Sequence, residues 1–384
     1  MRVAVVAGPD PGHAFPAIAL CLRFQAAGHT PVLFTGVAWL STAASAGLDA
    51  AELLGLDPDP ADNDLDAGAK IHRRAARMAV LNLDRLRAFD LVVSDVITAC
   101  GGMAAELLGI PWIELNPHPL YRPSIGLPPI GSGLAPGTGL RGRVRDATMR
   151  ALTARSWNQG LRQRAHARAG IGLPAHDPGP LRRLIATLPA LEVPRPDWPE
   201  EAVIVGPLHF EPTSQSLAVP PGDGPLIVVA PSTASTGTQG LAELVVEVLV
   251  PGEALPAGSR VAVSWLGGEL KLPPWAVAGL GRQDELLSQA DLMICGGGHG
   301  TVSKTLLAGV PMVVVPGGGD QWEIANRVVR QGSGQLIRPL AGDTLAAAVR
   351  EVLSVSRYRR AAQSAGVTSA GVADPVQVCQ DALG

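Results

Sequence analysis

The chain has 384 residues, of which 47% are hydrophobic and 17% are charged, and its formal net charge is −3. This length suits two domains of roughly 190 residues each, and the apolar content allows both to bury a core. A charge so near zero argues against nucleic acid or another acidic polymer as the partner. Only 4% of the residues are aromatic, so Ala, Val and Leu supply the apolar mass, which is typical of α/β proteins.

The four cysteines, Cys21, Cys100, Cys295 and Cys379, are scattered and never paired as C-x-x-C. We therefore expect four reduced thiols, with no disulfide framework and no metal site. No apolar run approaches the ~18 residues of a membrane span. The chain enters a strand at its second residue without a signal peptide, which predicts a cytoplasmic protein.

Strand and helix signals alternate through the first half of the chain. Continuous apolar runs predict strands, and helical stretches of about a dozen residues separate them. We predict strands over 2–8, 30–36, 89–95 and 110–116, and helices over 14–29, 37–48 and 98–109. This alternation implies right-handed βαβ units in a parallel sheet.

Two polar residues lie at the carboxyl ends of predicted strands. His13 follows the first strand, and Asp95 ends the strand over 89–95. The carboxyl ends of parallel strands share one edge of the sheet, so both side chains face the same cleft. A histidine there suits a general base, and the carboxylate would orient and charge-stabilise its imidazole. The alternative is that each residue only caps a helix.

The middle of the chain contains a Pro/Gly-rich loop from 122 to about 140 and then an arginine-rich helix. Eight arginines fall between 141 and 168. They either form a solvated helix or contact an anionic membrane surface or acceptor. Strands over 184–191 and 202–208 close the first domain, and 211–224 has the composition of a linker.

After the linker the alternation restarts. We predict strands over 225–230, 261–267, 276–281, 291–295 and 311–316 with helices between them, and a helical segment from Thr344. The division is then a domain over 1–210 and a domain over 225–384, whose last helix can pack back on the first. Two such sheets face each other across a cleft, and ligands bind outside the carboxyl ends of their strands.

The stretch "ICGGGHGTVSKTLLAGVP", 294–311, places three glycines between a strand and a helix. A helix N-terminus attracts anions, and glycines let the backbone approach phosphate closely. The pattern comes within one residue of a nucleotide-triphosphate loop, but Ser303 stands where that loop has glycine. The alternatives are therefore ATP, the diphosphate of a nucleotide-sugar, or a connection without a ligand.

The segment 281–334 resembles the donor-binding signature of family 1 glycosyltransferases and of the related peptidoglycan N-acetylglucosaminyltransferase. The shared pattern is x-Q-x-x-x-L, G-G-x-G-T, A-G-V-P and D-Q. The segment 8–29, with G-H-x-x-P and a helix ending in G-H, is similar to the opening of the same family. The resemblance implies an α/β protein of the two-domain GT-B fold, with the nucleotide-sugar on the C-terminal domain and the acceptor on the N-terminal one.

The resemblance also implies roles for particular residues. His13 and Asp95 would deprotonate the acceptor, and Asp320 with Gln321 would bind sugar hydroxyls. The Asp could instead cap the helix that follows it. The other residues implied in donor binding are Ser232, Thr233, Leu280, Gln283, Gly297, Gly298, His299, Gly300, Thr301 and Lys304.

Three positions depart from the family pattern. Gly296 stands where many relatives place a histidine that binds a phosphate; His299 could substitute for it or face solvent without a role. Lys304 replaces a glutamate that binds the ribose, and since a cation cannot accept those hydrogen bonds, it would contact a phosphate or point to solvent. Ile324 replaces an asparagine. The nucleotide is left open between UDP and dTDP.

The sequence thus predicts an inverting, metal-independent glycosyltransferase that needs no cofactor. Its donor is a UDP- or dTDP-sugar, and its acceptor is a small hydrophobic molecule such as a secondary metabolite. A two-domain nucleotide-sugar epimerase and a nucleotide-sugar-binding protein without turnover are the alternatives.

Overall fold

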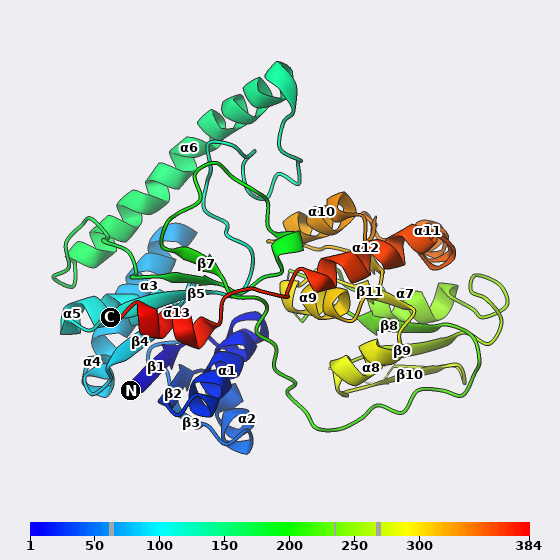
Figure 1. The fold of residues 1–384 in the computed structure, drawn as a ribbon, viewed down its shortest axis with the longest axis horizontal. Helices are drawn as coiled ribbons and strands as arrows, with labels where there is room; N and C mark the ends of the chain where they lie inside the picture. The colour runs from blue at the N-terminus through cyan, green and yellow to red at the C-terminus, as the bar shows by residue number, and fades with distance from the viewer. Residues whose placement is uncertain (61–64, 234–235, 266–269) are drawn as a thin grey trace.

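A computed structural model describes residues 1–60, 65–233, 236–265 and 270–384. In this part of the chain, thirteen strands form two sheets in which every pairing is parallel. Figure 1 shows the two sheets side by side, each flanked by helices. This confirms the predicted α/β class with two parallel-sheet domains.

The first sheet has seven strands, and the order in space is 3-2-1-4-5-6-7. Its strands are β1 (Arg2–Val6), β2 (Thr30–Thr35), β3 (Asp49–Glu52), β4 (Leu91–Asp95), β5 (Trp112–Asn116), β6 (Arg183–Ile185) and β7 (Ala202–Ile204). Its helices are α1 (Pro11–Ala26), α2 (Leu40–Ser45), α3 (Ala67–Leu81), α4 (Leu83–Leu86), α5 (Cys100–Leu108) and α6 (Gly139–Ala169), with a 3-10 turn, η1 (Val37–Trp39).

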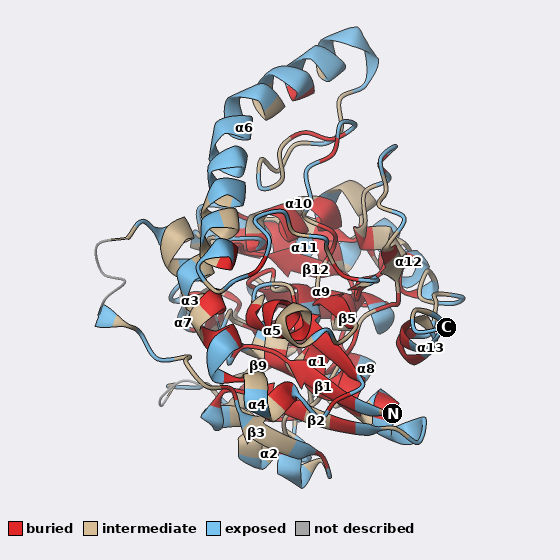
Figure 2. Ribbon diagram, turned by 90° about the vertical axis from the view of Figure 1, so that its left-hand side faces the viewer, coloured by how far each residue is buried: buried red, intermediate tan, exposed pale blue. Residues whose placement is uncertain are grey.

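Alternate residues of each strand enter different cores because successive side chains point to opposite faces of a sheet. Val3 and Val5 pack with α1, whereas Ala4 and Val6 pack with α3 and α5. Burial on both faces explains why these strands read as continuous apolar runs in the sequence. Figure 2 shows the buried strands at the centre of the molecule.

The second sheet has six strands in the order 10-9-8-11-12-13. They are β8 (Leu226–Ala230), β9 (Arg260–Ser264), β10 (Ala276–Gly279), β11 (Leu292–Cys295), β12 (Met312–Val314) and β13 (Gly334–Leu336). The helices of this half are α7 (Leu241–Val248), α8 (Gln283–Gln289), α9 (His299–Leu307), α10 (Gln321–Gln331), α11 (Gly342–Ser354) and α12 (Ser356–Val367).

The connection between the sheets and the chain end determine how the halves meet. The final helix, α13 (Pro375–Asp381), returns to the first domain, where Val376 and Cys379 join the core beneath α1 (Figure 1). A 3-10 turn, η3 (Pro189–Leu191), contacts α10 and α12 of the second domain. All four cysteines are buried and free, as expected.

The arginine-rich helix α6 projects from the body of the molecule, and most of its surface is exposed (Figures 1 and 2). Among its arginines, Arg168 is fully buried and pairs with Glu106 and Asp177. Arg141, Arg143, Arg155 and Arg162 are exposed. Solvation therefore accounts for only part of the arginine content of this helix.

The structure differs from the predicted elements at a few places. The predicted strand over 184–191 ends at Ile185, because Pro189 starts a 3-10 turn instead. The described residues between β9 and β10 contain no helix, contrary to the prediction, and Pro273 and Pro274 oppose one there. The predicted strand over 261–267 ends at Ser264, and its residues 266–267 lie outside the described chain. β3, α3 and β13 were not predicted.

Candidate active site

The two predicted catalytic residues, 82 positions apart, meet at the carboxyl edge of the first sheet. β1 pairs with β4 at the point where the strand order reverses, so the residues that follow both strands lie together. His13 Nδ1 lies 2.7 Å from Asp95 Oδ1. An ionised carboxylate only accepts hydrogen bonds, so Nδ1 carries the hydrogen and Nε2 is left with a lone pair.

Asp95 is held rigidly while it orients His13. Its side chain is fully buried, and Oδ2 accepts bonds from Ile97 N, Thr98 N and Thr98 Oγ1 at 3.0–3.2 Å. These bonds close a turn before α5, whose N-cap is Ala99. Asp95 is therefore not the N-cap of that helix, which leaves its other oxygen for the imidazole.

The environment of His13 favours its protonated form. Burial alone would lower the pKa of His13, but the hydrogen bond and charge of Asp95 and the charges of Asp10 and Asp320 outweigh it and raise the pKa. Asp320 belongs to the second domain, at the start of α10. A carboxylate of one domain thus acts on the imidazole of the other.

The glycine turn joins β11 to α9 at the corresponding point of the second sheet, where β8 pairs with β11. Gly297 has a φ of +86°, a conformation that L side chains rarely adopt, and Gly298 is the N-cap of α9 without a side-chain bond. The backbone N–H groups of residues 299–301 open the helix and have no partner within it. The turn can therefore receive an anion.

The departure at Gly296 has a steric cause. A Cβ at this position would lie 2.8 Å from Ser232 Cβ and 3.0 Å from Ser232 N. The loop after β8 closes against the turn, so no side chain fits where many relatives carry histidine. Ser232 and Thr233 lie in this loop, and residues 234–235 lie outside the described chain.

His299 neither faces solvent nor reaches toward Gly296. Its side chain is buried, its Nε2 lies 2.9 Å from Thr187 Oγ1, and its ring bonds the backbone of Pro117. Burial lowers the pKa of His299 to about 3, with the charge of Arg327 acting in the same direction, so the imidazole is neutral. Both expectations for this side chain are wrong: it joins the two domains, and only its backbone N–H belongs to the turn.

Lys304 does not point to solvent but forms an ion pair with a carboxylate of the linker. Its Nζ lies 2.5 Å from Glu211 Oε1, and both side chains are 13% exposed. Glu211 Oε2 accepts a bond from Gln283 N at 3.1 Å. The cation that replaces the family's glutamate is therefore neutralised by a carboxylate at the start of the linker.

The side chains of Asp320 and Gln321 differ in whether they already have hydrogen-bond partners. Asp320 is exposed, and although it is the N-cap of α10, its side chain makes no capping bond. Gln321 is buried; its Oε1 accepts from Gly317 N at 3.0 Å, and its Nε2 donates to Ser232 Oγ at 2.8 Å. Asp320 is thus free to bind a ligand, whereas Gln321 ties the loops that surround the turn.

The remaining predicted donor residues lie at the edge of the same sheet. Leu280 follows β10 and is 41% exposed. Gln283 begins α8, and its Nε2 donates to Ser264 Oγ at 3.2 Å. Both lie at the carboxyl ends of β9 and β10.

His118 was not predicted as a site residue; it lies two residues after β5, separated from the strand by Pro117. Its ring centroid lies 6.1 Å from that of His13. The position of His118, two residues after a predicted strand that ends at the same sheet edge as His13 and Asp95, was the signal that could have found it.

Comparisons with known proteins show the family of this chain. Residues 241–383 match the family described as "Erythromycin biosynthesis protein CIII-like, C-terminal domain". The chain is 30% identical to 4'-demethylrebeccamycin synthase of Lentzea aerocolonigenes over 93% of each protein. This chain belongs to the natural-product glycosyltransferases.

Solved structures give the fold of this glycosyltransferase independently. The glycotransferase of kitacinnamycin superposes with a TM-score of 0.76 at 23% identity, covering 100% of this chain and 99% of the other. Spinosyn rhamnosyltransferase complexed with thymidine diphosphate superposes with a TM-score of 0.71 at 20% identity and covers 100% of both chains. The two sheets of the glycosyltransferase therefore form the GT-B fold.

No helix of the described residues is long and apolar enough to span a membrane. The same residues contain no group of three or more His, Cys, Asp or Glu side chains arranged to hold a metal ion.

Proposed function

We propose that the chain is an inverting glycosyltransferase that moves a sugar from a dTDP- or UDP-sugar to a hydroxyl of a small hydrophobic acceptor without a metal ion. The observation that carries this proposal is the His13–Asp95 pair within electrostatic reach of Asp320 from the other domain. The thymidine diphosphate in the spinosyn rhamnosyltransferase structure supports a nucleotide donor.

In the proposed reaction, His13 Nε2 removes the proton of the acceptor hydroxyl. The oxygen attacks the anomeric carbon from the face opposite the leaving group, a C–O bond forms, and the bond from that carbon to the phosphate oxygen breaks. A single displacement inverts the anomeric configuration. Asp95 stabilises the imidazolium that forms, as the carboxylate does in a catalytic triad.

The nucleoside diphosphate leaves into the glycine turn. The N–H groups at the start of α9 point toward the developing charge, and the helix dipole adds to the stabilisation. Asp320 would accept hydrogen bonds from sugar hydroxyls. These groups supply the charge stabilisation that a metal ion gives in other transferases.

The test begins with binding. A thermal-shift screen of UDP, dTDP and their sugars identifies the donor, and transfer to a panel of aglycones is then followed by chromatography. His13→Ala should keep nucleotide binding and lose about 10²- to 10⁴-fold in transfer rate. His166→Ala, on the exposed face of α6, is the matched control.

Three further measurements test the finer statements. The product should carry the anomeric configuration opposite to that of the donor, and EDTA should leave the rate unchanged. Incubation with the donor alone should give no epimerised sugar. Full transfer activity in His13→Ala would remove the proposed base, and an epimerised donor would favour the alternative enzyme.

A further inference from the structure

His118 lies beside the proposed base, within electrostatic reach of the proposed sugar-binding carboxylate, Asp320, and has no assigned role. Its ring is edge-on to His13, with an interplanar angle of 81°. The charge of Asp320 acts on His118 as it does on His13. The imidazole thus lies near both groups that the proposed function assigns to the reacting sugar.

The hydrogen-bond pattern of His118 determines what its ring can bind. Nδ1 lies 2.8 Å from the carbonyl oxygen of Pro119. Since a carbonyl only accepts, the hydrogen of the neutral ring is on Nδ1 and the lone pair is on Nε2. No hydrogen-bond partner of Nε2 occurs among the residues that the structure describes, and the side chain is only partly buried.

Burial keeps this ring neutral. It lowers the pKa of His118, and the bond to Pro119 with the charges of Asp320 and Asp95 offsets burial only in part. His13 also opposes protonation of its neighbour. A neutral ring retains the lone pair of Nε2, which can accept a hydrogen bond from a hydroxyl group.

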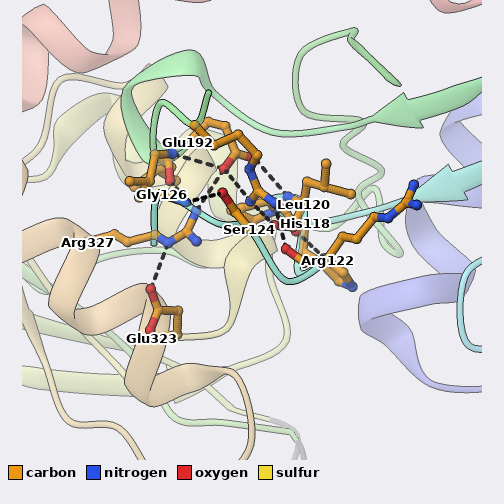
Figure 3. Close-up of polar contacts among 12 residues, drawn as sticks. His118, Leu120, Arg122, Ser124, Gly126, Glu192, Glu323 and Arg327 are labelled. Atoms are coloured by element: carbon orange, nitrogen blue, oxygen red, sulfur yellow. Dashed lines mark hydrogen bonds and ion pairs between the residues drawn. The ribbon is translucent and has the colours of Figure 1, made fainter. Parts of the chain in front are cut away.

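The loop that carries His118 is fixed from both domains, as Figure 3 shows. Glu192 Oε2 accepts a bond from Leu120 N at 2.7 Å, and Arg195 Nη2 donates to Leu120 O at 2.6 Å. Arg327 of α10 donates to Glu192 at 3.3 Å and to Leu191 O at 2.8 Å. The position of the imidazole is therefore tied to the docking of the second domain.

Tyr121 completes this arrangement. Its ring stacks on that of His118, with centroids 4.4 Å apart and an interplanar angle of 19°. The guanidinium of Arg327 lies 5.6 Å from the ring centroid of Tyr121. A continuous series of contacts thus runs from Arg327 through Tyr121 and His118 to His13. A group held this firmly at the junction is suited to select among ligands.

We propose that His118 accepts, through Nε2, a hydrogen bond from a hydroxyl of the transferred sugar. The inference rests on the proposed function, because it places the sugar between His13 and Asp320. His118 is then a residue of the N-terminal domain that binds the sugar held by the C-terminal domain.

Two substitutions separate this role from simple packing. His118→Phe keeps a ring against Tyr121 and removes the acceptor. His118→Gln removes the ring and places an amide oxygen near the position of Nε2. Calorimetry on both variants and the wild type measures Kd for dTDP, dTDP-glucose, dTDP-rhamnose, UDP and UDP-glucose. The quantity compared is the ratio of Kd for the nucleoside diphosphate to Kd for its best-bound sugar derivative.

We expect His118→Phe to reduce this ratio by about 2- to 10-fold, the contribution of one hydrogen bond, with the Kd of the nucleoside diphosphate unchanged. His118→Gln should retain most of the ratio. An exposed histidine supplies the control, His166→Phe, which should match the wild type.

Other outcomes overturn the inference in distinguishable ways. A wild-type ratio in His118→Phe together with a reduced ratio in His118→Gln would show that only the ring matters. A changed acceptor KM with an unchanged ratio would assign His118 to the acceptor. If the wild-type protein itself gives a ratio of one for every sugar, it makes no contact with the sugar, and the inference fails although the nucleotide site stands. A wild-type protein that binds none of the five probes would refute the proposed function itself.

Discussion

Asp95 Oδ1 and His13 Nδ1 lie 2.7 Å apart, and the other oxygen of Asp95 is bonded three times to the turn that follows β4. The imidazole therefore has one tautomer and one orientation, with Nε2 available for a proton. The contact joins two strand ends that are neighbours only because β4 inserts beside β1.

Replacing Asp95 should impair catalysis without affecting the donor. Asp95→Asn keeps the size of the side chain but can donate to Nδ1 and so favour the wrong tautomer. We expect the transfer rate to fall by about 10²- to 10⁴-fold. Steady-state kinetics with the identified donor measure this, and dTDP affinity serves as the control. A variant that transfers at the wild-type rate would show that Asp95 has no part in orienting the base.

The pH profile should report the raised pKa of His13. The base must be unprotonated, so the rate should rise tenfold per pH unit and reach a plateau above a pKa higher than 6.5. In Asp95→Asn, the hydrogen bond and the charge that raise the pKa of His13 are lost, while burial still lowers it. The rising part of the pH–rate profile should therefore move to lower pH. A rise at the same pH in both proteins would contradict the assignment of His13 as the titrating base.

Gly297 should be needed for nucleotide binding. An added Cβ would lie 3.0 Å from Val314 Cγ1 and 3.1 Å from Gln321 O, at a φ of +86°. Gly297→Ala should therefore deform the turn and weaken dTDP binding. Gly109→Ala is the control, since Gly109 has a φ of +68° with nothing within 4 Å and lies far from the turn in the sequence. Both variants should lose stability, by about 1–2 kcal/mol for the backbone strain, but only Gly297→Ala should lose affinity in calorimetry.

The pair of Lys304 and Glu211 should stabilise the start of the linker on α9. Lys304→Met leaves a largely buried carboxylate without its cation, so the free energy of unfolding should fall by about 1–3 kcal/mol. Lys304→Met combined with Glu211→Gln should recover part of the loss, because neither charge is then left unpaired. Urea unfolding of the two single variants and the double variant measures the coupling. Strictly additive effects would mean that the two side chains do not interact in solution.

Arg327 should matter more for stability than its neighbour Arg330. The Arg327 side chain is 2% exposed and pairs with Glu192 of the first domain and Glu323 of its own helix. Arg327→Ala leaves both carboxylates buried and should cost about 3–5 kcal/mol. Arg330 is 24% exposed and lies 3.4 Å from Glu323, so Arg330→Ala should cost less. Thermal unfolding compares the two, and an equal loss would argue against the interdomain pair.

The local pattern of the sequence was sufficient for the fold class and for placing the candidate site residues at the ends of strands. Strands buried on both faces read as apolar runs, and His13, Asp95 and the glycine turn each follow such a run. The short strand β3 was not predicted because its residues, Asp49–Glu52, carry a charge at each end of a partly exposed strand. The helix α3 was not predicted either, and it lies outside the two segments, 8–29 and 281–334, that carry the resemblance.

The sequence by itself determined the alternation of strands and helices and the residues at the strand ends, because periodicity and turn composition are local properties. Only the tertiary structure decided the partners of those residues: Thr187 for His299, Glu211 for Lys304, and Ser232 for Gln321. These contacts join positions 89 to 112 residues apart. Such pairs form when domains dock and loops pack, so no pattern within one segment contains them.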